Sequence, residues 1–340
     1  MNMSFYGRLV LVVSGLTLGT TTLADHPSMA FGADSTGPIN TVSAAVLPGG
    51  KWTGGLRTEM TNFDGFSNNE LTRFAENGLE GVHSVERLTK TTVSLAYGIT
   101  ERLTASLQVP YIERRSINEA EIEDDVAEAH RHGGSSGLGD LLLLGQYQVV
   151  ARDKTDVALL FGIKAPTGKT DIKDSGGQRF ETEFQPGSGS LDYLAGVAAS
   201  RQLTVVNLHA NVLYHATNGG AQRAEIGNAL SYNVALTYRL GAPHKRHTQH
   251  HDHHSAMHGN AMRWDLVLEL NGETRSEDKV AGLADTHSGG TKVYFAPGIR
   301  LSLTDNWSGY LSYAVPVIEN HKGAQTDVDR RIVAGISVGF

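Results

Sequence analysis

Histidine is concentrated in one short stretch of this 340-residue chain. Seven of the 15 histidines lie there, with Asp252 and Met257 among them: His244, His247, His250, His251, His253, His254 and His258. Imidazole nitrogen is a common ligand of borderline metal ions, so the tract predicts binding of Cu, Zn or Ni. A loop that gathers three or four such nitrogens without a preformed cavity would bind with modest affinity and weak selectivity. The alternative interpretation is a solvated low-complexity loop without a selected ligand.

A second candidate for cation binding is an acid-rich segment. Its carboxylates are followed by two imidazoles, in the order Glu119, Glu121, Glu123, Asp124, Asp125, Glu128, His130 and His132. Carboxylates beside imidazoles attract cations. Three other interpretations stay open: the segment keeps the surface soluble, binds divalent ions that bridge lipopolysaccharide, or forms one exposed charged helix.

Two segments resemble catalytic or nucleotide-binding motifs without matching them. Five residues separate Gly162 from Gly168, where a phosphate-binding loop has four, and the segment leaves a predicted strand without opening a helix. Gly187-Ser188-Gly189-Ser190 lacks the strand-to-helix context of a nucleophile elbow. We therefore expect no catalytic residues, no enzymatic activity and no required cofactor beyond a metal on the histidine tract.

The composition narrows the classes of protein. With no Cys, disulfide scaffolds, thiol catalysis and Cys-ligated zinc are excluded. A formal net charge of -7 provides no overall basic field, so nucleic acid is not an expected partner. The charged fraction of 19% lies below the roughly 25% of soluble domains, and 39 glycines exceed the average share. A charge-rich soluble helical protein is therefore disfavoured.

The first 24 residues predict export. Arg8 precedes an apolar run from Leu9 to Leu18, and small residues at Thr22 and Ala24 precede a cleavage point before Asp25. This order is typical of a secretory signal peptide. An uncleaved anchor is the alternative, although the apolar run is shorter than the roughly 20 residues that span a bilayer.

Most of the remaining sequence alternates between apolar and polar residues with period two, which predicts strands. In the last strand, Ile332, Ile336 and Phe340 fall on one face, and Arg331 and Ser337 on the other. About twelve such segments are expected, each near the 9 to 11 residues of a tilted transmembrane strand. They lie near residues 52–62, 90–99, 102–112, 139–150, 155–165, 190–200, 203–215, 229–240, 262–273, 291–303, 306–317 and 329–340.

The connections between these segments alternate between short and long. Outer-membrane barrels have short periplasmic turns and long outer loops. The alternation therefore predicts that both chain ends and the histidine tract face the periplasm and that the acid-rich segment faces outward. The histidine tract is the one long link on the side of the short turns. A secreted soluble β-sandwich is the alternative, but it does not require this alternation.

One face of the strands carries polar side chains, which would line the lumen of a barrel. We predict as lumen-lining residues Arg57, Glu59, Gln108, Gln146, Lys164, Asp192, His209, Arg239, Glu269 and Arg300. A barrel of about twelve strands lies between eight, where side chains fill the interior, and sixteen, where a water channel opens. The lumen is therefore expected to be narrow, or plugged by the segment 25–50.

Three glycine-rich motifs resemble landmarks of a known family. They are Gly137-Leu138-Gly139-Asp140-Leu141, Lys164-Ala165-Pro166-Thr167-Gly168-Lys169, and Gly187-Ser188-Gly189-Ser190 followed by Asp192. They are similar to motifs of the outer-membrane transporter-like family named for the meta-pathway of phenol degradation. The resemblance implies a barrel related to outer-membrane hydrocarbon channels. The histidine tract is an insertion relative to that family.

The sequence thus predicts an all-β, antiparallel, transmembrane outer-membrane β-barrel. Residues 1–24 would be a signal peptide, 25–50 a periplasmic segment or plug, and 51–340 the barrel with a His-rich loop at 241–260. The expected function is passive passage of a small solute, either hydrophobic or aromatic or related to a metal. The alternative is a metal-binding protein that uses the His-rich loop in metal homeostasis or resistance. The expected location is the outer membrane of a Gram-negative bacterium, where lipid, lipopolysaccharide and a small solute or metal ion would be the partners.

Overall fold

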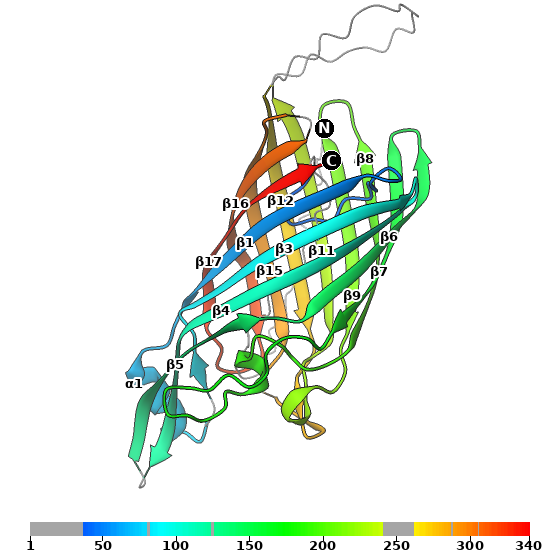
Figure 1. Cartoon of the computed structure of the whole chain (residues 1–340). Coiled ribbons are helices and arrows are strands. Elements are labelled where there is room, and N and C mark those ends of the chain that lie inside the picture. Colours follow the sequence, from blue (N-terminus) through cyan, green and yellow to red (C-terminus); the bar gives the residue numbers. More distant parts are fainter. Residues whose placement is uncertain (1–36, 80–81, 124–125, 241–261, 287, 305) are drawn as a thin grey trace, which may run out of the picture.

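The chain folds into a closed antiparallel β-barrel of twelve strands, seen from the side in Figure 1. The computed structural model describes all residues except 1–36, 80–81, 124–125, 241–261, 287 and 305. The barrel strands are β1 (Trp52–Asp64), β3 (Arg87–Thr100), β4 (Leu103–Glu123), β6 (Leu141–Arg152), β7 (Thr155–Ala165), β8 (Asp192–Gln202), β9 (Asn207–Ala216), β11 (Ala229–Leu240), β12 (Arg263–Arg275), β15 (Gly290–Ser302), β16 (Trp307–His321) and β17 (Asp327–Gly339). Pairing of β1 with β17 closes the ring.

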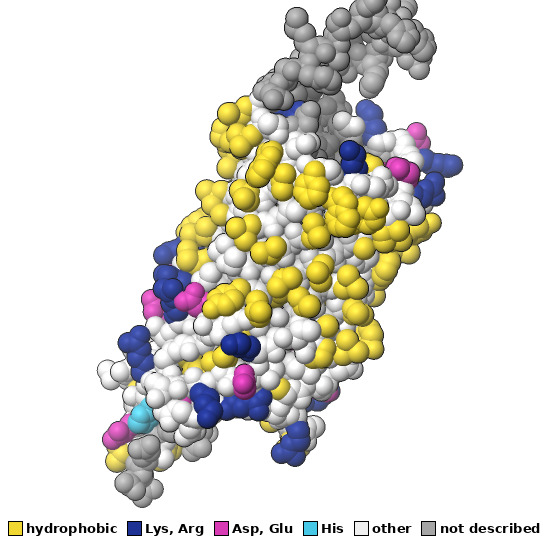
Figure 2. Space-filling model, viewed as in Figure 1, with side chains coloured by type: hydrophobic (Ala, Val, Ile, Leu, Met, Phe, Trp, Pro, Cys, Tyr) yellow, Lys and Arg dark blue, Asp and Glu magenta, His cyan; other side chains and the backbone are white. Residues whose placement is uncertain are grey.

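The alternation of side chains explains why these segments become barrel strands. In β12, Leu266, Leu268 and Leu270 project outward, and Leu268 is 48% exposed. Glu269 between them is only 1% exposed and points into the barrel. Exposed apolar side chains occur on all of the barrel strands, and on the face shown in Figure 2 they form a broad belt, while Lys, Arg, Asp and Glu gather toward the two ends. This pattern fits a barrel surrounded by lipid, with a polar interior.

The two ends of the barrel differ. Turns at 101–102, 153–154, 203–206 and 303–306, together with the C-terminus, lie at what we call the short-turn end. Trp52, Trp264 and Trp307 are exposed there at the beginnings of their strands. The opposite, long-loop end carries all the longer described connections. The predicted strands and the predicted alternation of link lengths are thus confirmed.

The long-loop end has small elements of its own. These are α1 (Asn68–Glu76), β2 (His83–Ser84), β5 (Val126–Leu138), the 3-10 turns η1 (Thr182–Phe184) and η2 (Ala221–Arg223), β10 (Ala224–Glu225), β13 (Lys279–Val280) and β14 (Leu283–Ala284). Helix α1 begins with a capping box between Ser67 and Glu70 and buries Leu71 and Ala75. Among the described residues, no helix has the length and apolar character needed to cross a membrane.

The acid-rich segment is part of a β-hairpin. Strand β4 continues past the barrel, and β5 returns along it, pairing Glu119 with His130 and Glu121 with Glu128. The interpretation of this segment as one exposed helix is therefore wrong. Pairing with β5 satisfies the backbone of the extension, and Ala120 on its inner face is buried against α1 and Ala324.

We predict that a charge on the outer face of β12 destabilises the barrel. Leu268→Arg should lower the free energy of folding into lipid vesicles by about 2–4 kcal/mol, because the side chain lies midway along the strand. Leu240→Arg, at the short-turn end of β11, should cost at most about 1 kcal/mol. Urea titrations of both variants measure the difference, and equal losses would contradict the placement of the apolar belt.

Candidate functional site in the barrel interior

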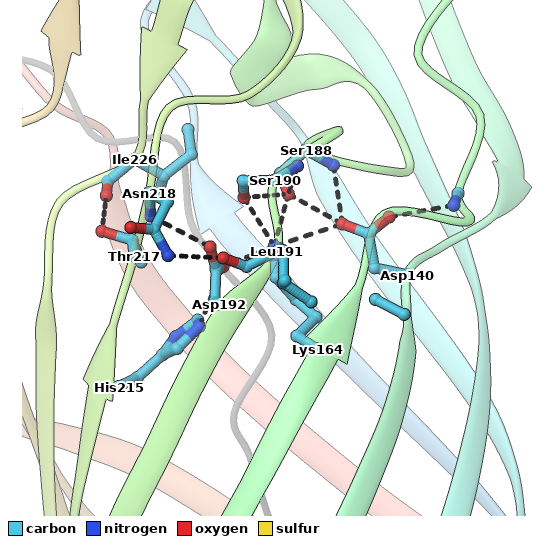
Figure 3. Close-up of polar contacts among 12 residues, drawn as sticks. Asp140, Lys164, Ser188, Ser190, Leu191, Asp192, His215, Thr217, Asn218 and Ile226 are labelled. Atoms are coloured by element: carbon cyan, nitrogen blue, oxygen red, sulfur yellow. Dashed lines mark hydrogen bonds and ion pairs between the residues drawn. The ribbon is translucent and has the colours of Figure 1, made fainter.

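Three glycine-rich segments that are far apart in the sequence meet at the long-loop end of the barrel interior. Asp140, between β5 and β6, lies at their junction (Figure 3). Its carboxylate accepts hydrogen bonds from the Gly168 amide at 2.9 Å and from the amide and hydroxyl of Ser188 at 2.9 and 2.7 Å. Lys164 Nζ lies 3.2 Å from the same carboxylate. Asp140 therefore joins the ends of β6, β7 and β8.

A second buried carboxylate completes this network. Asp192, the first residue of β8, has an oxygen 2.7 Å from Lys164 Nζ and 3.0 Å from His215 Nε2. Its other oxygen accepts the Asn218 amide at 3.0 Å. Lys164 also donates to the hydroxyls of Ser188 and Ser190. One lysine thus compensates two buried carboxylates, and such an arrangement is strongly destabilised when one partner is removed.

The glycines of these motifs are required by close backbone contact. A Cβ atom on Gly168 would lie 2.6 Å from the Gly187 Cα and 2.7 Å from the Gly139 carbonyl carbon. A Cβ on Gly187 would in turn lie 2.6 Å from Gly168. Any side chain at these positions would push the loops apart and move Ser188 away from Asp140.

The network borders a cavity of about 110 Å³ inside the barrel. Its lining is mixed. Apolar groups come from Pro110, Ile112, Leu142, Pro186 and Ile226, and charged or polar groups include Lys90, Arg114, Asp140, Lys164, Asp192, His215 and Arg275. Four basic side chains and two carboxylates thus face one small space. This combination can hold a small molecule that has both apolar and polar parts.

The chain segment 37–47 runs through the rest of the barrel interior. Glu269 accepts the backbone amides of Ile39, Asn40 and Thr41 at 2.9 to 3.2 Å, and the Asn40 side chain at 2.7 Å. Farther along, Asn211 accepts the Val42 amide, Ser200 the Ala44 amide and Thr104 the Leu47 amide. Barrel side chains thus replace the strand partners that this extended segment lacks.

The same segment also makes apolar contacts with the barrel wall. Val42 and Ala44 are buried in a cluster with six inward-facing side chains of β6, β7 and β8 and with Leu213 of β9: Leu142, Leu144, Ala158, Leu160, Leu194, Ala198 and Leu213. Ile39 packs on Val267 and Val333. The interior of the barrel therefore contains an apolar strip that the segment covers.

The predicted lumen residues fall into three groups in the structure. Arg57, Glu59, Gln146, Glu269 and Arg300 lie around segment 37–47. Arg57 donates to the Ile39 carbonyl and pairs with Glu59 at 3.2 Å, Gln146 donates to the carbonyls of Ser43 and Ala45, and Arg300 donates to those of Gly37 and Pro38.

Gln108, Lys164 and Asp192 form the second group and line the cavity. His209 and Arg239 form the third group. His209 shares a hydrogen bond with Ser200, and Arg239 pairs with Asp265 at 2.9 Å near the short-turn end. The residues missed by sequence reasoning are Lys90, Arg114 and Arg275. Their basic character and their position on the inward face near the ends of strands could have predicted that they line the interior.

The structure describes only some of the predicted metal-binding residues. The tract His244, His247, His250, His251, His253, His254 and His258 lies outside the described residues. Its flanking strands, β11 and β12, reach the short-turn end. In the acid-rich segment, Glu119 Oε2 lies 2.8 Å from His83 Nε2 and 3.6 Å from His132 Nε2. His83 itself was not anticipated, since it precedes the segment by more than thirty residues.

The apolar belt, the charged interior and the twelve closed strands define the class of protein as an outer-membrane β-barrel. The chain belongs to the family described as "Putative MetA-pathway of phenol degradation", whose profile matches residues 63–317. This range contains all three glycine-rich motifs that meet at Asp140. The resemblance noted from those motifs is thus confirmed.

A solved structure of an outer-membrane channel shares the fold. The COG4313 outer membrane channel from Pseudomonas putida F1 is 17% identical, with a TM-score of 0.57, and the match covers 87% of this chain and 97% of the channel. The NanC porin (10% identity, TM-score 0.40, covering 85% and 98%) and the KdgM porin (9%, 0.38, covering 85% and 99%) match more distantly. No curated protein matches the chain.

We predict that Gly168→Ala disrupts the junction at Asp140. The added methyl group would meet backbone atoms of Gly187 and Gly139, and overpacking of this kind costs about 1–3 kcal/mol. The matched control is Gly219→Ala, because a Cβ there has no neighbour within 4 Å. Protease digestion of the folded barrels should cleave the long loops of the Gly168 variant faster than those of the Gly219 variant. Equal rates would show that the contact between the loops is not needed.

Proposed function

We propose that the protein is a passive channel for small solutes, in which residues 37–47 block the lumen in the resting state. The observation that carries this proposal is the contact between Glu269 and three consecutive backbone amides of that segment. A closed barrel with a polar interior provides a route across the membrane, and a segment held by side-chain hydrogen bonds can leave that route without breaking the barrel. No enzymatic step is part of the proposal.

The proposed location is the outer membrane of a Gram-negative bacterium, with a mature chain beginning at Asp25 after removal of residues 1–24. Short turns face the periplasm in outer-membrane barrels. The cavity near Asp140 would then open from the outside, and segment 37–47 would enter the lumen from the periplasmic end. Lipid and lipopolysaccharide would surround the apolar belt.

The proposed solute is small and partly apolar. Pro110, Ile112, Leu142 and Ile226 give the cavity an apolar wall, and the covered strip around Leu144 and Leu160 continues the apolar surface toward the short-turn end. Basic side chains outnumber carboxylates in the cavity lining, which favours a solute with a polar or anionic group at one end. Small aromatic acids and phenols have this chemistry.

The channel proposal predicts that loosening segment 37–47 increases conductance. Glu269→Ala removes a charged acceptor of four hydrogen bonds, and hydrogen bonds to charged groups contribute about 1.5–3 kcal/mol each. The open fraction in planar lipid bilayers should therefore rise at least about tenfold.

The matched control is Asp265→Ala. Asp265 lies on the same face of β12 as Glu269, but it pairs with Arg239 and not with segment 37–47. The open fraction of this variant should remain that of the parent protein. No ion or solute flux through the Glu269→Ala barrel would contradict the channel proposal.

A second candidate function is metal binding by the histidine tract, in metal homeostasis or resistance. The described links at the short-turn end are otherwise tight turns, whereas the link from β11 to β12 is long and carries seven histidines. We propose that Cu, Zn or Ni binds there on the periplasmic side. The barrel would then anchor the tract at the membrane.

Calorimetry with Cu²⁺, Zn²⁺ and Ni²⁺ tests this second candidate. Replacing the seven tract histidines by Ser should remove the tract-dependent heat at pH 7, and the parent protein should bind more weakly near pH 5, because protons compete for imidazole. Conductance should be unaffected by the replacement, so the two candidate functions are separable. Binding that is the same with and without the histidines would contradict the tract as the site.

A further inference from the structure

We infer that the long-loop end holds a site for one divalent transition-metal ion, formed by His83, Glu181 and Glu183. A ring nitrogen of His83 and one carboxylate oxygen from each glutamate lie within 4.8 Å of one another. The three residues belong to two separate loops, since His83 is in β2 and the glutamates flank Thr182 in and before η1. This site lies at the opposite end of the barrel from the ends of β11 and β12 that flank the histidine tract, and its ligands are not those of the proposed histidine-tract site.

The turn that carries the glutamates is held in place by side chains of β4 and β5. Arg114 donates to the carbonyls of Phe184 and Gln185, and the Ser135 hydroxyl donates to the Phe184 carbonyl. The Phe184 side chain is buried, and its ring lies 4.6 Å from the His83 ring, centroid to centroid, at an interplanar angle of 56°. The contact between these rings positions His83 beside the turn, so the three ligands are set in place by the protein.

One ring nitrogen of His83 is already used by a carboxylate. His83 Nε2 lies 2.8 Å from Glu119 Oε2, which also lies 3.6 Å from His132 Nε2, and His132 Nδ1 lies 3.2 Å from Asp174. A histidine that binds a metal through one nitrogen usually donates the other N–H to a carboxylate. Glu119 has this position, which leaves Nδ1 of His83 as the proposed ligand atom.

Glu183 and His83 are half-buried, whereas Glu181 is exposed. Among the described residues, none donates a hydrogen bond to the Glu183 carboxylate, so its oxygens are available to a cation.

The ligand set identifies the class of ion. One imidazole and two carboxylates suit Zn²⁺ or a similar borderline ion better than Ca²⁺, which prefers six or more oxygen ligands. Glu181 is exposed, so an ion can enter from the solvent at the long-loop end. A second group, Glu319, His321 and Asp327, is also compact, but Glu319 already accepts the Val328 amide and His321 pairs with Asp327 at 3.0 Å.

The test is Zn²⁺ titration of the full chain in detergent, in a background where the seven tract histidines are replaced by Ser. This background should bind one equivalent of Zn²⁺ at micromolar or tighter affinity through the proposed site. Glu183→Gln, which keeps the side-chain volume, and His83→Gln should each remove that equivalent. Glu119→Gln should only weaken binding, by about 10- to 100-fold, because Glu119 positions the histidine.

Asp327→Asn is the matched control, because it alters the other compact group at the same end and should retain the equivalent of Zn²⁺. Heat-modifiable migration on denaturing gels checks that every variant forms a folded barrel. If His83→Gln does not fold, the Zn²⁺ binding of Glu183→Gln alone tests the proposed site. The proposal is overturned if the background binds no Zn²⁺, if Glu183→Gln binds as the background does, or if Asp327→Asn instead removes the equivalent.

Discussion

The structure depends on one constraint, which is that backbone polar groups surrounded by lipid must find partners within the protein. Pairing of β1 with β17 meets this requirement by leaving no open sheet edge. Closure with twelve strands then creates an interior too wide to be filled by the wall's own side chains alone. Segment 37–47 occupies that space, and its backbone groups are in turn satisfied by Glu269, Asn211, Ser200 and Thr104.

Charge in the interior follows from the same constraint. Arg300 and Arg57 donate to carbonyls of segment 37–47, while Glu269 accepts its amides, so the inward charges serve the backbone of the segment as well as each other. At the long-loop end the same principle joins the glycine-rich motifs. Asp140 accepts backbone amides from both ends of the loop between β7 and β8, and Lys164 compensates its charge. Solute passage would require exchange of some of these bonds for bonds to the solute.

Period-two alternation was sufficient to predict the twelve strands and their inward faces, because lipid and lumen impose opposite demands on successive residues. The contact of Gly139, Gly168 and Gly187 was not visible in the sequence, since it depends on the register in which β6, β7 and β8 pair. The same holds for His83 and Glu183, which lie a hundred residues apart. The conformation of the acid-rich segment could not be predicted because its charges fit a helix or a hairpin equally well. In the structure, its pairing with β5 makes it a hairpin.

The interior cavity and the proposed metal site at His83 meet in the short turn η1. Thr182 and Gln185 line the interior cavity, whereas Glu181 and Glu183, on either side of Thr182, contribute to the proposed metal site. Arg114 holds the turn from the cavity side through the carbonyls of Phe184 and Gln185. An ion bound to Glu181, Glu183 and His83 would therefore fix the turn from the outer side as well. Because a bound ion favours the conformation that binds it, the cavity wall formed by η1 would be more rigid in the metal-loaded protein than in the metal-free one.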